Sequence, residues 1–284
     1  MKVGFVGLGA MGASMARNIA GAGLLASVWN RTSMRAQGLG HELKVAVADN
    51  LPELASQVNI VVCCVSADSD VVEVVNALRP GLKAGSVVVD TSTVSSETAQ
   101  QIEKILAEVG VAFLDSPVSG GVEGARIGNL AMMVGGNSTN LEKVRPVLEA
   151  MGSQIVHMGP VGAGQATKAV NQIMAAGINQ AVTEALAFGD SQALPMDQLI
   201  DVISAGAAGN WFLEHRGPSL VKNSFKPGFK LGLHHKDLEI CRQMAAKKGF
   251  ESSVIKKTLE DYKLLMDQGF QDEDISALYR LKTS

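Results

Sequence analysis

The sequence predicts an α/β chain whose N-terminal domain holds a parallel sheet, followed by an all-helical domain joined to it by a long helix. Over roughly the first 160 residues, short β-branched runs alternate with helical segments, which is typical of a parallel sheet. After Gly164 the strand patterns stop. At 46% apolar the chain is too hydrophobic to be disordered. We place the domains at residues 1–161 and 162–284.

Several predicted strands of the first domain are unbroken β-branched runs, as expected for strands buried on both faces. The predicted strands are residues 2–6, 27–30, 60–65, 87–90, 112–115, 131–134 and 155–157. The predicted helices between them are residues 12–22, 51–57, 70–78, 95–108 and 140–150. Ser95, followed by Ser96 and Glu97, is typical of a helix start.

A long helix is predicted to open the second domain, over residues 165–193. Apolar side chains recur there at every fourth position, which predicts a largely buried helix about 40 Å long. These positions are Val170, Met174, Ile178, Val182 and Leu186. Further helices are predicted over residues 196–204, 211–215, 236–248, 253–268 and 272–281, with Gly249 and Gly269 at two C-terminal caps.

Composition excludes several classes of protein. The net charge of −3 excludes a basic nucleic-acid footprint, and no run of 18 apolar residues predicts a membrane span. Glycines interrupt the apolar stretch near the N-terminus, so we expect no secretory signal. The three cysteines form no disulfide framework, and Cys63 and Cys64 lie in a predicted buried strand. A cytoplasmic location is therefore expected.

The glycine-rich segment after the first strand predicts a Rossmann-type dinucleotide site. Its residues are Gly7, Leu8, Gly9, Ala10, Met11 and Gly12. Gly7 permits the tight turn, Gly9 lets a pyrophosphate approach the backbone, and Gly12 allows close packing of helix and strand. The N–H groups of the following helix favour the phosphates.

The end of the second predicted strand indicates which dinucleotide binds. NAD sites usually place Asp or Glu there, whereas this chain has Asn30, Arg31 and Thr32. A carboxylate repels a 2′-phosphate, and a guanidinium with a hydroxyl binds it. We therefore predict NADP(H) in preference to NAD(H).

Two further motifs indicate a reaction centre. The turn Ser119-Gly120-Gly121 offers a hydroxyl and backbone N–H groups suited to a carboxylate. Lys168 lies in the opening turns of the long helix, where a lysine can act as an acid toward a carbonyl oxygen. Asn171 and Gln172 are its i+3 and i+4 neighbours and share its helix face.

A third motif holds two adjacent histidines before Lys236, a candidate cofactor contact. Because adjacent side chains on a helix diverge by about 100°, His234 and His235 do not form a metal site, and no metal is expected. Trp211 follows a glycine-rich segment, and both pocket lining and core packing are consistent with it.

Together these motifs resemble the β-hydroxyacid dehydrogenase family over essentially the full chain. The resemblance rests on VGFVGLGAMG, DSPVSGG, GxGxxxK with Asn171, and LHHKDL. It implies that Lys168 is catalytic and that the chain forms a homodimer or homotetramer through its helical domain. It further implies substrate contacts at Ser119, Gly120, Gly121, Asn171, Gln172, Phe229 and Asp237, and cofactor contacts at Val65, Ser66, Thr93 and Lys236. Gln172 departs from the second Asn that many members carry.

The resulting hypothesis is an NADPH-dependent oxidoreductase that reduces a small aldehyde or keto acid bearing a carboxylate, such as a semialdehyde or glyoxylate, and catalyses the reverse oxidation. One alternative is a 3-hydroxyisobutyrate or other β-hydroxyacid dehydrogenase that uses NAD. A 6-phosphogluconate dehydrogenase normally has His where Asn171 stands. Imine reductases usually have Asp or Tyr at the Lys168 position. A non-catalytic oligomeric cofactor-binding module typically lacks this lysine.

Overall fold

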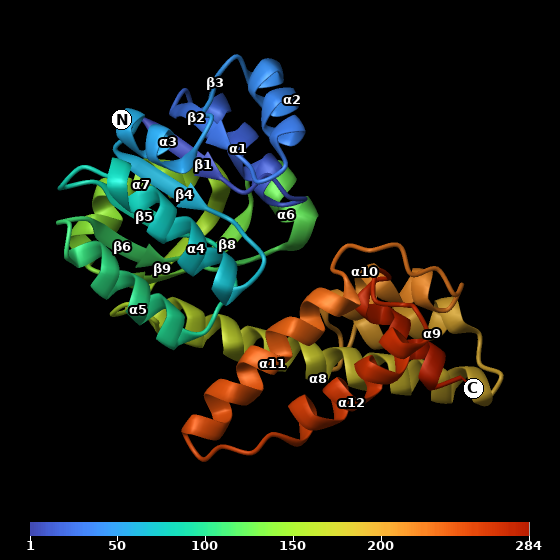
Figure 1. Ribbon diagram of the computed structural model, residues 1–284. Helices are drawn as coiled ribbons and strands as arrows, with labels where there is room; N and C mark the ends of the chain where they lie inside the picture. Colours follow the sequence, from blue (N-terminus) through green and yellow to red (C-terminus); the bar gives the residue numbers. More distant parts are fainter. Residues whose placement is uncertain (284) are drawn as a thin grey trace. The chain divides into compact units, whose positions relative to one another are not determined.

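The computed structural model describes residues 1–283, which form two compact units that divide between Lys168 and Ala169 (Figure 1). This division falls inside helix α8 (Ala163–Ser191), and the domain boundary predicted at residues 161/162 lies just before that helix. Residue 284, the last of the predicted helical domain, lies outside the described residues. As the sequence predicts, the first unit is a Rossmann-type α/β domain and the second is helical.

The first unit is built on a nine-stranded sheet in the order β3-β2-β1-β4-β5-β6-β8-β7, with β9 paired to β8. The pairs among β1 to β6 are parallel, as predicted, whereas β8 runs antiparallel to β6 and β7, so the far side of the sheet is mixed. The strands are β1 (Val3–Val6), β2 (Leu25–Trp29), β3 (Ala46–Val47), β4 (Ile60–Cys63), β5 (Val87–Asp90), β6 (Ala112–Asp115), β7 (Val118–Ser119), β8 (Leu130–Gly136) and β9 (Gly152–Gly159).

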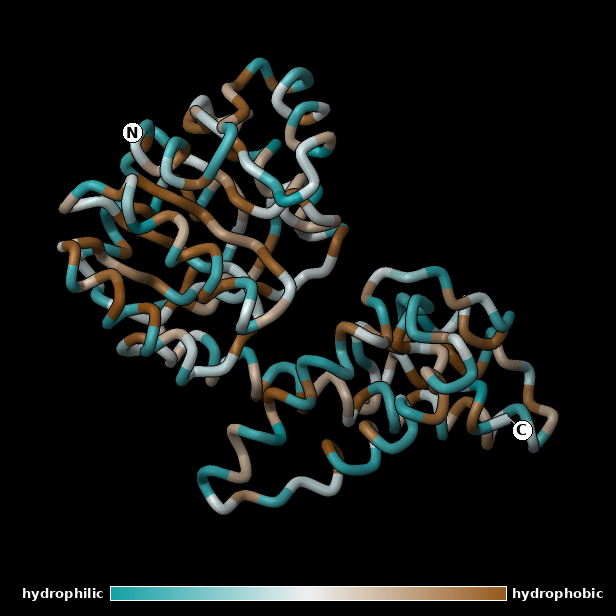
Figure 2. The backbone as a smooth tube through the Cα atoms, in the orientation of Figure 1, coloured by the Kyte–Doolittle hydropathy of each residue, from teal (hydrophilic) through white to brown (hydrophobic). Residues whose placement is uncertain are grey.

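Helices cover both faces of this sheet because the central strands carry apolar side chains on both faces. In β4, Ile60 and Val62 join one core cluster while Val61 and Cys63 join the other. The first cluster includes side chains of α1 (Gly12–Gly21), α2 (Ser33–Leu43), α6 (Gly121–Ile127) and α7 (Ser138–Met151); the second includes α3 (Leu51–Gln57), α4 (Asp68–Leu78) and α5 (Ser96–Ala107). Figure 2 shows that hydrophobic residues run through the interior of this unit.

The sequence patterns did not predict four short or glycine-containing elements: α2, α6, β3 and β7. Gly38 and Gly40 obscure the apolar period of α2, and Gly124 obscures that of α6. The helix start at Ser95 is confirmed, since its side chain accepts a hydrogen bond from the N–H of Thr98.

The second unit packs helices around one apolar cluster that includes Leu186, Leu238 and Tyr262. Besides the rest of α8 it contains α9 (Met196–Ser204), α10 (Trp211–Leu220), α11 (Leu231–Lys247), α12 (Ser253–Asp267) and a 3₁₀ helix (Ile275–Leu281). The helix predicted over residues 272–281 is this 3₁₀ helix, and the Asp274 carboxylate caps its start by accepting from the N–H of Ser276. Gly249 and Gly269, with φ of 66° and 89°, confirm the two predicted caps.

Helix α8 is less buried than its sequence predicts. Val182 and Leu186 are buried, but Val170 and Met174 are 61% and 63% exposed. A spacing of four residues advances about 40° beyond each full turn, so the series from Val170 to Leu186 drifts about 160° around the helix. Val170 and Leu186, the two ends of this series, therefore lie on nearly opposite faces of the helix. No helix within residues 1–283 combines the length and apolarity that crossing a membrane requires.

Candidate active site

The turn between β1 and α1 contains two glycines, Gly7 and Gly12, whose positions leave no room for a side chain. A Cβ on Gly7, whose φ is 93°, would lie 2.2 Å from the carbonyl oxygen of Cys64. A Cβ on Gly12 would lie 1.9 Å from the carbonyl oxygen of Gly7. A Cβ on Gly9, in contrast, has no atom within 4 Å. Gly7 and Gly12 thus serve the fold, while the space beside Gly9 is open to a ligand.

The N-terminus of α1 suits an anion. Met11 at its N-cap makes no side-chain capping hydrogen bond, and no acidic residue lies in the first turn. The N–H of Leu8 donates to Asn30 Oδ1 at 2.8 Å, which ties the turn to the end of β2. Free N–H groups at the positive end of a helix bind phosphate, so these residues fit the pyrophosphate of a dinucleotide.

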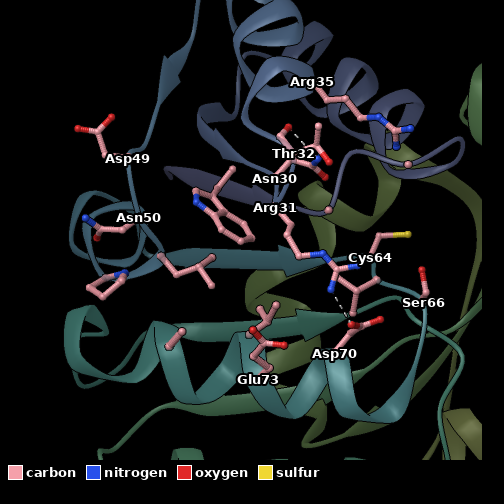
Figure 3. Close-up of a pocket in the computed structure, with 18 residues that line it drawn as sticks. Asn30, Arg31, Thr32, Arg35, Asp49, Asn50, Cys64, Ser66, Asp70 and Glu73 are labelled. Carbon is pink, nitrogen blue, oxygen red and sulfur yellow. Dashed lines mark hydrogen bonds and ion pairs between the residues drawn. The ribbon is translucent and has the colours of Figure 1, made fainter.

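A pocket of about 440 Å³ adjoins this turn and is lined by all the residues predicted after β2 and β4 (Figure 3). Its lining includes Gly7, Gly9, Asn30, Arg31, Thr32, Val65 and Ser66. The other predicted cofactor contacts, Leu8, Ala10, Met11, Gly12, Thr93 and Lys236, are not among its lining residues.

The pocket carries charges of both signs. Arg31, whose side chain is 79% exposed, forms an ion pair with Asp70 of α4 at 3.2 Å, marked by a dashed line in Figure 3. Arg35 adds a second cation, and Asp49 and Glu73 add acids. Sequence reasoning missed Arg35 because α2, on which it lies, was not predicted, and it missed Asp70 because that residue is 39 positions from Arg31.

Helix α8 begins on a buried carboxylate. Asp115, the last residue of β6, accepts hydrogen bonds from the N–H groups of Gly162 at 2.8 Å and Gln165 at 2.9 Å. Glycine is required on both sides, since a Cβ on Gly135 or Gly164 would lie within 2.8 Å of this carboxylate. The Gln165 side chain bonds the backbone of Ser92 and Val94 after β5. The start of α8 is thus fixed to the carboxyl ends of two strands.

A second buried carboxylate lies at the end of β5. Asp90 Oδ1 accepts from the N–H and hydroxyl of Ser92, while Oδ2 has no hydrogen-bond partner among residues 1–283. Burial raises the pKa of Asp90 to about 6. Burial also raises the pKa of Asp115, although backbone N–H groups, those of Gly162 and Gln165 first, oppose the shift.

The frame around the start of α8 positions Lys168. Its side chain is only 8% exposed, and its Nζ donates to the carbonyl oxygen of Val118 at 2.8 Å. Val118 is followed in the chain by Ser119 and then by Gly120 and Gly121, whose φ angles are 134° and 63°. The structure thus brings Lys168 beside the turn predicted to hold a carboxylate, although the two are about 50 residues apart in sequence.

In the second unit, four predicted site residues form one chain of contacts. Lys236 Nζ lies 2.7 Å from Asp237 Oδ1, and Gln172 Nε2 donates to Asp237 Oδ2 at 2.6 Å. Asn171 Nδ2 donates to Gln172 Oε1 at 2.8 Å. Gln172 and Asp237 are 2% and 5% exposed. The ring of Phe229 lies 5.3 Å from that of His234, whose Nε2 contacts the carbonyl oxygen of Gln172.

The comparisons with known proteins agree along the whole chain. Residues 2–159 match the NAD-binding domain of 6-phosphogluconate dehydrogenase, and residues 162–282 match the family described as NAD-binding of NADP-dependent 3-hydroxyisobutyrate dehydrogenase. The chain belongs to the β-hydroxyacid dehydrogenase family. It is therefore an oxidoreductase with NAD(P)-binding domains.

Individual members of this β-hydroxyacid dehydrogenase family align over most of their length. The NAD-dependent L-serine dehydrogenase of Pseudomonas aeruginosa is 32% identical over 99% of this chain and 97% of its own. The 2-hydroxy-3-oxopropionate reductase of Escherichia coli is 35% identical over 86% and 84%. The solved Mycobacterium tuberculosis 3-hydroxyisobutyrate dehydrogenase with L-serine has a TM-score of 0.91 at 31% identity and covers 100% of this chain and 99% of that one.

The surroundings of His234 and Trp211 bear on the two interpretations that the sequence left open for this dehydrogenase, a metal site and pocket lining. His234 is fully buried, and its ring nitrogens contact the Tyr262 hydroxyl and the carbonyl oxygen of Gln172. Within residues 1–283 no cluster of three metal-ligating side chains occurs. Trp211 is 60% exposed and stacks on His215, so core packing, one of its two interpretations, is wrong.

Proposed function

We propose that this enzyme reduces a small aldehyde or keto acid bearing a carboxylate to the hydroxy acid with NADPH, and catalyses the reverse oxidation, with Lys168 as general acid and base. The observation that carries the proposal is the position of the Lys168 ammonium, 2.8 Å from the carbonyl oxygen of Val118 and next to the Ser119-Gly120-Gly121 turn. A proton donor beside a carboxylate-binding turn matches a substrate that has a carbonyl and a carboxylate close together.

The proposed chemistry divides between cofactor and protein. Bound NADPH supplies a hydride to the carbonyl carbon and is thereby oxidised. Lys168 donates its proton to the carbonyl oxygen as the carbon is reduced, and in the oxidation direction the neutral lysine takes the proton back. The Ser119 hydroxyl and the backbone of Gly120 and Gly121 bind the carboxylate. Asn171 orients the substrate, and Asp115 and Gln165 hold the start of α8.

On the cofactor side, the glycine turn holds the pyrophosphate and the residues after β2 bind the ribose end. Arg31 and Thr32 line the pocket without an acid at the end of β2, which favours the 2′-phosphate of NADP(H). The proposed contacts Val65, Ser66, Thr93 and Lys236 complete this side of the site.

A second candidate, a β-hydroxyacid dehydrogenase that uses NAD, is favoured by one observation. Asp70 already neutralises Arg31, and Asp49 and Glu73 bring further negative charge to the pocket. One relative, the L-serine dehydrogenase, is named as NAD-dependent. The two candidates differ in the ratio of kcat/KM for NADPH to that for NADH.

A steady-state panel tests the proposal. Glyoxylate, succinic, tartronate and methylmalonate semialdehydes are reduced with each cofactor, and 3-hydroxyisobutyrate and L-serine are oxidised. We expect NADPH-dependent turnover of at least one carbonyl acid. Turnover with NADH at equal or higher kcat/KM selects the second candidate. Tight NADPH binding without turnover of any of these compounds contradicts the proposed activity.

We also propose that the enzyme is a homodimer or homotetramer in the cytoplasm. The helical unit exposes large apolar side chains, including Val170, Met174 and Phe188, whose burial against a second copy stabilises an oligomer. None of the three cysteines forms a disulfide within residues 1–283, which suits a reducing compartment. Light scattering after size-exclusion chromatography measures the oligomeric state, and a monomeric mass contradicts it.

A further inference from the structure

We infer that Ser92 is a positioning residue for the dinucleotide: its hydroxyl holds Val65 where the chain leaves the sheet, and so fixes the loop after β4 against the glycine turn. This inference rests on the proposed cofactor contacts at Val65 and Ser66. All the groups involved belong to the first unit, at the carboxyl ends of β1, β4 and β5.

The Ser92 hydroxyl takes over where the backbone pairing of β4 with β5 ends. The N–H of Thr91 still donates to the carbonyl oxygen of Cys63, the last residue of β4, at 2.8 Å. Every second residue of a strand faces the same neighbouring strand, so Val65 is the next residue of this segment to face β5. Its N–H donates to Ser92 Oγ at 2.9 Å instead of to a backbone carbonyl. A side chain thus anchors the loop at the point where it leaves the sheet.

A buried carboxyl group fixes the polarity of this hydroxyl. The N–H of Val65 can only donate, so Ser92 Oγ must accept there and its single proton must be directed elsewhere. That proton is donated to Asp90 Oδ1 at 2.6 Å, and the same oxygen accepts the N–H of Ser92 at 3.1 Å. Because both groups of Ser92 donate to Asp90, the lone pairs of the hydroxyl are left for Val65.

Burial and a second contact make the hydroxyl a fixed anchor. Ser92 is 2% exposed and Asp90 is fully buried, so water is excluded from the hydroxyl and cannot replace it. The backbone of Ser92 is held from another side, because its carbonyl oxygen accepts from Gln165 Nε2 at 2.9 Å. The position of Val65 therefore depends on that of Ser92.

Val65 lies directly against the turn that we propose binds the pyrophosphate. A Cβ on Gly7 would lie 3.1 Å from Val65 Cγ1 and 2.2 Å from the carbonyl oxygen of Cys64. Cys64, Val65 and Ser66 line the pocket beside that turn, where Figure 3 labels Cys64 and Ser66. A loop released from Ser92 would move two proposed cofactor contacts at once, and ordering it again on binding would cost affinity.

The chain contains a matched control one residue earlier. Thr91 Oγ1 donates to the carbonyl oxygen of Cys63 at 2.7 Å, and Thr91 is 3% exposed. This hydroxyl also links the end of β5 to that of β4, but it bonds a residue of the sheet that the backbone N–H of Thr91 already holds. Thr91→Val should therefore lower stability without releasing the loop after β4.

The test compares cofactor affinity with stability. We measure the dissociation constants of NADPH and NADH, the Tm without cofactor, and kcat and the cofactor KM with the best panel substrate, for wild type, Ser92→Ala, Thr91→Val and Asp90→Asn. Asp90→Asn keeps an oxygen toward Ser92, since both groups of Ser92 donate. Ser92→Cys, which fills the same space and accepts only weakly, guards against an unstable Ser92→Ala.

We expect Ser92→Ala and Ser92→Cys to weaken binding of the preferred cofactor about tenfold, with kcat at saturating cofactor within about threefold of wild type. Thr91→Val and Asp90→Asn should keep the dissociation constant within about twofold. Equal weakening in Ser92→Ala and Thr91→Val, or unchanged affinity in Ser92→Ala, overturns the inference. A loss in Asp90→Asn as large as that in Ser92→Ala overturns it too, because the charge of Asp90 would then act in place of the hydroxyl.

A readout without cofactor separates this inference from the proposed function. In enzyme labelled with ¹⁵N-valine, the amide of Val65, assigned by Val65→Ile, should exchange with solvent at least about tenfold faster in Ser92→Ala and at the wild-type rate in Thr91→Val. Wild-type exchange in Ser92→Ala overturns the inference even if the enzyme is active. A wild-type enzyme that binds either cofactor without turnover of any panel compound refutes the proposed function and leaves this inference standing, whereas an enzyme that binds neither cofactor refutes both.

Discussion

Two buried carboxylates of each unit are bound by different kinds of group, although a third in the second unit, Asp274, accepts from backbone N–H groups as those of the first unit do. In residues 1–168, Asp90 and Asp115 accept from backbone N–H groups and a serine hydroxyl. In residues 169–283, Asp237 and Asp261 each pair with a lysine and a glutamine amide. The carboxylates of the first unit thus fix the backbone, above all the start of α8. Those of the second unit fix the orientation of lysine and glutamine side chains.

This difference separates two ways of building a site. In the first unit the ligand-facing groups are mainly backbone, so glycine positions and strand ends decide the geometry. In the second unit they are side chains, so charge and amide polarity decide it. Substitutions of buried groups should therefore act through packing and stability in the first unit and through orientation in the second. Lys168, Gly9, Arg31 and Ser92 are first-unit residues whose substitution should instead act on the ligands.

The largest effect is expected at Lys168. Replacing it with alanine should lower kcat about 10³-fold, because the proton donor is lost, while Tm and NADPH affinity stay close to wild type. Lys143→Ala is the matched control. The Lys143 ammonium also donates to a carbonyl oxygen, that of Gly85 at 2.6 Å, but Gly85 precedes β5 and so lies at the end of that strand away from Asp90. A kcat of Lys168→Ala near that of wild type would show that Lys168 is not the general acid and base.

The pH dependence of stability should distinguish the carboxylates of the first unit. Burial raises the pKa of Asp90 to about 6, so the unfolded chain, with a pKa near 3.9, loses this proton first as pH rises. Between about pH 4 and pH 6 the native state therefore loses about 2 kcal/mol of stability from this group, and the loss levels off at about 3 kcal/mol above pH 7.

Asp90→Asn removes the titrating group. The free energies of unfolding of variant and wild type are measured by urea titration at pH 4, 5, 6 and 7. The value of the variant minus that of wild type should rise by about 2 kcal/mol from pH 4 to pH 7. A difference between the two proteins that does not change with pH shows that Asp90 is ionised throughout and rejects this interpretation of its burial.

The glycines of the first unit should separate folding from binding. Gly12→Ala places a Cβ 1.9 Å from a backbone oxygen and should lower stability by about 2 kcal/mol. Gly9→Ala meets no atom within 4 Å, so it should leave Tm unchanged and weaken NADPH binding at least about tenfold. Gly21→Ala, in open space at the end of α1, is the control and should change neither property adversely. Equal NADPH affinity in Gly9→Ala places the pyrophosphate elsewhere.

The smallest effects concern the choice of cofactor. Arg31→Ala should reduce the kcat/KM ratio of NADPH to NADH about tenfold, because a charge-assisted bond to the 2′-phosphate is lost. Asp70→Asn should raise that ratio about threefold, since it releases Arg31 and removes a repelling charge. If neither substitution changes the kcat/KM ratio of NADPH to NADH, other residues discriminate between the two cofactors, and Arg35 is the next to test.

Local patterns predicted most of the first unit correctly. The β-branched runs placed β4, β5 and β6, and the glycine spacing placed the cofactor turn, because each depends on neighbours in sequence. The patterns failed where glycine interrupts a helix, as in α2, and Arg35 was missed with it. They also failed for α8, where four-residue spacing did not correspond to one buried face.

The sequence by itself determined the fold class, the family and the residue types at the proposed site, since these follow from short-range periodicity and from motifs of consecutive residues. Only the tertiary structure decided the contacts between distant segments: Lys168 on the carbonyl of Val118, Asp115 under the start of α8, Asp70 on Arg31, and Asp237 on Gln172. These pairs are 39 to 65 residues apart. Hydrogen bonds and ion pairs form wherever packing brings partners together, and no local pattern records which partners those are.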